Sequence, residues 1–174
     1  MLESKRRFHP EQGHPALVQT PRPTALLAPL ARIAAGEGSI RAGWVGPGVF
    51  YARFEGSISA DVGERYAALL KALVGDVRVL SYFVDSSDLT DYDLLARSAI
   101  LQAIMAHRSK FSSIVALTWA GGVGPIGRSF ASALGNVEYV TTRDDFDARL
   151  LAAAPFAREQ IALSSSAVRR IARR

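Results

Sequence analysis

A glycine pattern is the first feature of the sequence that could carry chemistry. Gly122, Gly124 and Gly127 form a GxGxxG motif after the apolar segment SIVALTW, and Pro125 suits the first turn of a following helix. Between a strand and a helix, such a turn can hold a pyrophosphate or a simpler anion on backbone N–H groups. Only 47 residues follow Gly127, too few for the second half of a dinucleotide-binding fold. A turn that lets helix and sheet approach closely explains the same glycines, so both interpretations stay open.

A second candidate site is the sequence DSSD, which directly follows the apolar run VRVLSYFV. Ligands of parallel sheets usually bind beyond the carboxyl ends of the strands. We therefore expect a loop that contacts a partner or ligand through Asp85, Asp88 and Asp91. Ser87 and Ser86 are its candidate phosphorylation sites. A simple turn, with side chains of the segment hydrogen-bonded to the backbone, is the alternative.

Other residue types that carry catalysis or bind metals give no comparable pattern. His9, His14 and His107 lack the spacing of metal ligands, and the aspartates after Val84 lack the glycine and terminal glutamate of a calcium loop. The absence of cysteine excludes disulfides, cysteine-bound zinc and thiol nucleophiles. No nucleophile stands out beside a base. We expect a protein that is not an enzyme and that carries no metal or cofactor.

The elements that must position these residues follow from the spacing of the apolar side chains. Strands are predicted over 39–45, 49–55, 77–84, 113–119 and 137–141, and helices over about 60–74, 92–108, 125–134, 142–153 and 157–173. The order β-β-α-β-α-β-α-β-α predicts an α/β fold, with a single mainly parallel or mixed sheet of about five strands and flanking helices.

Basic charge is concentrated at the two ends of the chain. The 174 residues carry a net charge of +5, with +3 on residues 1–43, +4 on residues 156–174 and −2 between them. We expect a flexible, basic, proline-rich arm over 1–38, an α/β domain over 39–155 and a basic helix over the last nineteen residues. Basic ends favour an acidic partner or nucleic acid, and solubilising tails are the alternative. No apolar run approaches the roughly 18 residues of a membrane span, and we expect a cytoplasmic protein without membrane contact.

Two features between Val49 and Ala153 point to a known family. The segment VFYARFEGSISADVGERYAALL contains a strand that ends in Gly56 before the first long helix, and VEYVTTRDDFDARLL joins a short strand to an Asp-Asp-Phe helix. In both, the chain resembles STAS domains, the sulfate-transporter and anti-sigma-factor-antagonist family, in a divergent stand-alone branch. The resemblance implies a domain that binds signalling proteins or small ligands. It also implies that Ser87 matches the serine that a partner kinase phosphorylates in antagonist members.

These patterns together predict a non-enzymatic regulatory module of a bacterial-type signalling pathway. It would bind a protein partner, such as a kinase or another regulatory protein, through Asp85–Asp93 and Gly121–Arg128. Nucleic acid would bind only through the basic tails. The alternatives are a small-ligand or nucleotide-binding domain that uses the Gly122–Gly127 turn, and a carrier of apolar ligands.

Overall fold

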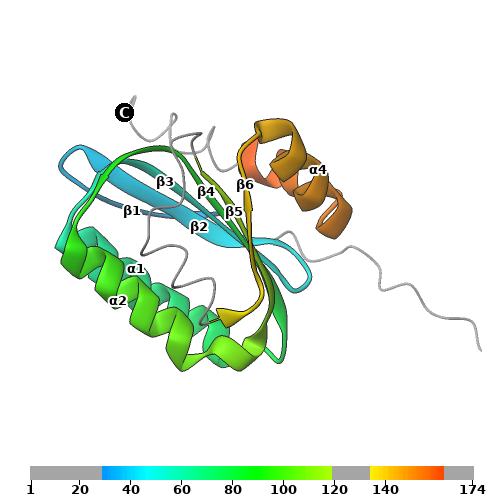
Figure 1. Ribbon diagram of the computed structural model, residues 1–174, viewed down its shortest axis with the longest axis horizontal. Coiled ribbons are helices and arrows are strands. Elements are labelled where there is room, and N and C mark those ends of the chain that lie inside the picture. Colours follow the sequence, from blue (N-terminus) through cyan, green and yellow to red (C-terminus); the bar gives the residue numbers. More distant parts are fainter. Residues whose placement is uncertain (1–28, 119–133, 163–174) are drawn as a thin grey trace, which may run out of the picture.

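The computed structural model describes residues 29–118 and 134–162 (Figure 1). Several predictions lie outside this part of the chain. They are most of the N-terminal arm, the helix expected over 125–134 apart from its last residue, and most of the C-terminal helix. The glycine pattern and the basic residue after it also lie outside the described residues, namely Gly122, Gly124, Gly127 and Arg128.

Within the described residues, six strands form one mixed sheet in the order in which they occur in the chain (Figure 1). They are β1 (Ala31–Ala35), β2 (Gly38–Gly46), β3 (Val49–Ile58), β4 (Leu80–Tyr92), β5 (Phe111–Leu117) and β6 (Val137–Val140). The first three strands pair in antiparallel fashion, and β3 to β6 pair in parallel. The predicted fold class, a mixed α/β sheet with flanking helices, is confirmed.

The first strand is a correction to the sequence prediction. Residues 31–38, which we expect from the sequence to belong to the flexible arm, instead form β1 and the tight turn into β2. Gly36 has a φ of +60° in this turn, a conformation that glycine adopts without strain. Ile33 lies opposite Ile40, and both side chains are buried. The stretch ARIAA offers one strongly apolar side chain beside Arg32, too weak an alternation to predict a strand.

The helices lie on both faces of the sheet. On one face lie α1 (Ala60–Gly75) and α2 (Leu94–Ala106), and on the other lies α4 (Arg143–Ala153) (Figure 1). A short 3-10 turn, Arg108–Lys110, leads into β5, and residues 157–162 form a further helical segment. Among the described residues, the elements after β1 follow the predicted order, and the ends of α1, α2 and α4 lie within a few residues of the expected positions.

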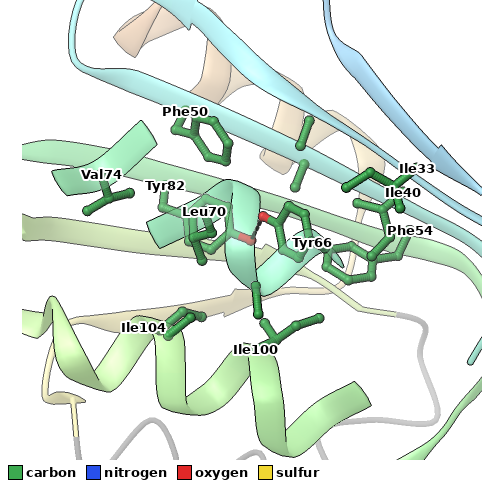
Figure 2. Close-up of a cluster of buried hydrophobic side chains, with 14 of the residues drawn as sticks. Ile33, Ile40, Phe50, Phe54, Tyr66, Leu70, Val74, Tyr82, Ile100 and Ile104 are labelled. Atoms are coloured by element: carbon green, nitrogen blue, oxygen red, sulfur yellow. Dashed lines mark hydrogen bonds between the residues drawn. The ribbon is translucent and has the colours of Figure 1, made fainter. Parts of the chain in front are cut away.

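A large apolar core lies between the sheet and the helices α1 and α2 (Figure 2). Its labelled members are Ile33, Ile40, Phe50, Phe54, Tyr66, Leu70, Val74, Tyr82, Ile100 and Ile104. The hydroxyl groups of Tyr66 and Tyr82 share a hydrogen bond of 2.5 Å inside this core. Because a buried hydroxyl needs a hydrogen-bond partner, this pairing lets two large side chains fill the core without leaving either hydroxyl unsatisfied.

A second, smaller core lies under α4. Phe83 of β4 meets Phe146 of α4 edge to face, with ring centroids 5.7 Å apart, and Leu150 packs beside them. Alternate residues of β3 and β4 point to this face, as the two-residue period of a strand requires. The same alternation brings Tyr51 and the carboxylate of Asp85 to it.

Candidate functional site

The DSSD sequence lies inside a strand, so the predicted loop is wrong. β4 continues eight residues beyond its predicted end and stops only at Tyr92. β3 is long enough to pair with this extension in parallel, with Arg53 opposite Asp85 and Ser57 opposite Asp91. The register shifts twice along the pairing, which accommodates the extra residues of β4. Residues that favour turns therefore adopt strand structure because a neighbouring strand supplies their backbone partners.

Asp85 is the centre of a polar network on the face that α4 covers. Its side chain is fully buried. Arg143 donates from Nη1 to Oδ2 at 2.8 Å and from Nη2 to Oδ1 at 3.0 Å. The Ser87 hydroxyl donates to Oδ1 at 2.8 Å, and the Tyr51 hydroxyl donates to Oδ2 at 3.2 Å. A buried carboxylate is tolerated only with such partners, and here they tie α4 to β3 and β4.

The surroundings of Asp85 favour its charged form. Burial by itself raises the pKa of this carboxyl, but the hydrogen bonds from Arg143 and Ser87 and the charge of Arg143 outweigh burial, so its pKa lies below the ordinary value. The hydrogen bond to Asp85 in turn raises the pKa of Arg143. Burial, followed by the charge of Asp85, raises the pKa of Tyr51. A carboxylate held ionised in this way is a weak base, poorly suited to activate Ser87 as a nucleophile.

Further ion pairs extend the network along the same face. Arg53 lies beside Asp85 on the neighbouring strand, pairs with Asp88, and places its Nε 3.1 Å from Glu55 Oε1. Arg41 of β2 is directly opposite Arg53 and also pairs with Glu55. The Nε of Arg53 is buried and makes no hydrogen bond within the described residues, because its approach to Glu55 has poor geometry. Arginines and carboxylates of three adjacent strands, β2, β3 and β4, therefore form one connected set of ion pairs.

The structure separates the residues that the sequence placed in one loop. Ser86 donates its hydroxyl to the carbonyl oxygen of Leu117 at 2.7 Å, whereas the hydroxyl of Ser87 joins the buried network and also accepts a 2.7 Å hydrogen bond from Arg143. The carboxylate of Asp88 is half exposed. Asp91, further along the strand, is also exposed. The roles in partner or ligand contact expected for these residues stay predictions.

Exposed leucines mark the start of α2. The exposed fractions are 69% for Leu94 and 64% for Leu95, and both follow directly after Asp93. Asp93 caps the helix by accepting hydrogen bonds from the backbone N–H of Leu95 at 2.7 Å and of Ala96 at 3.2 Å. The cap fixes the first helical turn, and with it the direction in which the two leucines point.

The first turns of α1 and α2 lie against each other. A Cβ atom placed on Gly63 would lie 2.4 Å from the Cα and Cβ of Ala96, so only glycine permits this approach. The contact places the first turn of α1, which carries the exposed Asp61 and Glu64, against the first turn of α2, which carries the exposed leucines, and the exposed Asp91 precedes Leu94 by three residues. We call this group the Leu94–Leu95 surface, and it consists of Leu94, Leu95, Asp61, Glu64 and Asp91.

Sequence reasoning missed the basic half of the polar network. Arg143 carries a signal that could have found it, because it stands at the first position of α4, where the helix dipole disfavours a cation. Such a position indicates that the arginine has an anionic partner elsewhere in the fold. Tyr51 and Arg53 carry no such signal, since alternation along β3 shows which face they share and not what they meet there.

The described part of the chain offers no group of three or more His, Cys, Asp or Glu residues that could hold a metal ion. Among the same residues, no helix is both long and apolar enough to cross a membrane.

A solved structure with a similar fold is an uncharacterized protein of the DUF3478 family from Shewanella loihica PV-4, described as having a SpoIIAA-like fold. The two chains share 14% sequence identity, and the match covers 64% of this chain and 93% of the other, with a TM-score of 0.46. No family model and no curated protein matches the chain. The likeness concerns the fold alone.

Proposed function

We propose that the chain is a cytoplasmic, non-enzymatic regulatory module that binds a protein partner through the Leu94–Leu95 surface. The observation that carries the proposal is the exposure of two adjacent leucines on a capped, rigid first turn. Each leucine leaves a large apolar side chain in water, which is unfavourable unless another surface covers it. Burial of such side chains in an interface removes their unfavourable contact with water and so favours binding.

The charge around the leucines indicates the chemistry of the partner. The Leu94–Leu95 surface carries the carboxylates of Asp61, Glu64 and Asp91. Two cations lie nearby: Arg65, in an exposed ion pair with Asp61 at 3.3 Å, and Arg97, whose guanidinium lies over the Tyr92 ring. Negative charge therefore dominates around an apolar centre. We infer that the partner presents an apolar pocket surrounded by lysine or arginine side chains, since such charges steer association and fix orientation.

The polar network around Asp85 supports a role other than catalysis. Each oxygen of its carboxylate already accepts hydrogen bonds, and the hydroxyl of Ser87 donates to this carboxylate while it accepts from Arg143. The low pKa of Asp85 makes the carboxylate a poor general base. The network is instead suited to hold α4 on the sheet.

Ser87 is a better candidate for regulation by phosphorylation than Ser86. The hydroxyl of Ser86 is committed to the backbone of β5, whereas that of Ser87 lies 2.7 Å from the guanidinium of Arg143. A phosphate on Ser87 would compete with Asp85 for Arg143 and would loosen the attachment of α4. Phosphopeptide mass spectrometry of the protein from its native cells should then detect the modification on Ser87. Modification of Ser86 alone would contradict this assignment.

Affinity capture with matched variants tests the partner-binding proposal. The full chain, a Leu94→Ser/Leu95→Ser variant and a Val79→Ser/Phe156→Ser control are used to capture proteins from native lysate. Val79 and Phe156 are 58% and 66% exposed and lie away from the surface, so the control removes comparable apolar area. The proposal expects a protein that the wild type and the control retain and that the leucine variant loses.

The captured protein is then purified and its affinity measured directly. If each leucine contributes about 1 to 2 kcal/mol to binding, the double variant binds at least about tenfold more weakly. The affinity should also fall as salt concentration rises, because opposite charges attract across the interface. Equal affinities of the leucine variant and the control would refute the proposal.

A further inference from the structure

A cleft of about 400 Å³ lies between the sheet and α4. The helix α4 covers the face of the sheet opposite α1 and α2 (Figure 1). Its lining comes from β3, β4, α4 and the helical segment 157–162. Its charged lining residues are Arg53, Arg143, Arg158, Asp88 and Asp147. The volume is at the low end of the range for small-molecule sites, so a ligand that it encloses is a small one.

The cleft combines guanidinium groups with an apolar wall. Arg53, Arg143 and Arg158 provide the cations, and Phe146, Leu150 and Ile161 are among its apolar lining residues. Guanidinium groups bind carboxylates and phosphates through paired N–H donors. We propose that this cleft binds a small amphipathic anion, with its carboxylate or phosphate on the arginines and its apolar part on α4 and the segment 157–162.

The three arginines differ in how readily they can accept a ligand. Arg143 is committed to the buried carboxylate of Asp85 by two hydrogen bonds and acts as a fixed part of the wall. Arg53 pairs with the half-exposed Asp88. Arg158 is 65% exposed and lies 3.3 Å from a carboxylate oxygen of Asp147. Ion pairs in contact with water contribute little, so an anion can replace Asp88 on Arg53 and Asp147 on Arg158. The Nε of Arg53 keeps its contacts with Glu55 at 3.1 Å and with Asp85 at 3.9 Å.

The site is independent of the Leu94–Leu95 surface. The leucines belong to the side of the sheet that α1 and α2 cover, whereas the cleft lies on the side of α4. Loss of partner binding by the leucine variant therefore leaves the cleft intact, and each proposal can fail without the other.

Ligand titrations of the full chain test the proposal. Octanoate and octyl phosphate are the probes, each followed by thermal shift and by calorimetry, and their comparison shows which head group the arginines prefer. Acetate lacks the apolar part, and 1-octanol and octylamine lack the negative charge. We expect a saturable rise in melting temperature with at least one of the two probes and none with the other three compounds. No saturable binding of either probe, or equal binding of octylamine, would overturn the proposal.

Variants then locate the binding. Arg158→Gln and Ile161→Ser should each raise the dissociation constant of the bound probe about tenfold or more; Arg158 is exposed, and Ile161 is only partly buried at the edge of the second core. Arg65→Gln, which removes an exposed, ion-paired arginine of α1, is the matched control and should bind the probe like the wild type. The Leu94→Ser/Leu95→Ser variant should also bind it normally. Unchanged affinity of both cleft variants would place the probe elsewhere and refute the site.

Discussion

The buried pair of Asp85 and Arg143 makes an asymmetric prediction about stability. Asp85 is fully buried, whereas the side chain of Arg143 is 42% exposed. Arg143→Gln therefore leaves the buried carboxylate with only the more distant Arg53 Nε, 3.9 Å away, as a cation, and Asp85→Asn leaves a cation that can turn to water. We expect the arginine change to lower the free energy of unfolding by about 3 to 5 kcal/mol. The aspartate change should lower it by about 2 kcal/mol, since solvent screens the arginine that remains.

The two changes should also respond differently to pH. In the wild type, the pKa of Asp85 is depressed, so its contribution to stability is present at neutral pH and is lost only as pH falls below about 4. In Arg143→Gln, burial dominates, and the pKa of Asp85 should rise above its ordinary value. Protonation then relieves the buried charge, so the stability difference between wild type and variant should narrow as pH falls from 7 to 5.

Urea unfolding of the wild type, both single variants and the double variant gives these free energies. Circular dichroism and tryptophan fluorescence should report the same transition, with similar m-values for all four proteins. The double variant should lose at least about 1 kcal/mol less free energy of unfolding than the two single variants lose in sum, because it removes both charges of one pair. Equal costs of the two single changes, or a difference that does not vary with pH, would refute the buried-pair reasoning.

Three further predictions concern other parts of the structure. Gly63→Ala should lower stability by about 1 to 3 kcal/mol, because the new methyl group overlaps Ala96, whereas Gly75→Ala, with open space around it, should be neutral or stabilising. Burial raises the pKa of all five tyrosines, so absorbance at 295 nm should correspond to less than one ionised tyrosine at pH 10. Above that pH the absorbance should rise together with unfolding, because tyrosines of the unfolded chain ionise at lower pH than the buried ones. Tyrosines that titrate normally at pH 10 in a folded protein would contradict this prediction. Ser87→Asp should lower the melting temperature, because it places a second carboxylate beside Asp85, and Ser87→Ala should lower it less.

The sequence predicts the architecture because most elements are encoded locally. The apolar run before DSSD, the spacing of α1 and the cap of α4 by Thr142 each identify an element without knowledge of its neighbours. The extension of β4 is different. Asp and Ser favour turns on their own, and only the length of β3 beside them decides that residues 85–92 form a strand.

The candidate site depends on contacts between distant residues, and this is why the sequence shows only half of it. Asp85 was identifiable from its position after a buried strand, but its partner Arg143 lies 58 residues later. The exposure of Leu94 and Leu95 also depends on tertiary structure, since an apolar pair at the start of a helix usually packs inward. The structure shows instead that Ala96 and Ile100 face the core.

Hydrogen–deuterium exchange of the full chain, with and without the protein that it captures, tests partner binding at the Leu94–Leu95 surface most directly. Exchange reports local protection along the backbone, so it locates the interface without any substitution. The account predicts slower exchange at the start of α2 and in the first turn of α1, and unchanged exchange in α4. Protection confined to α4, or no added protection around Leu94 and Leu95 at saturating partner, would contradict it.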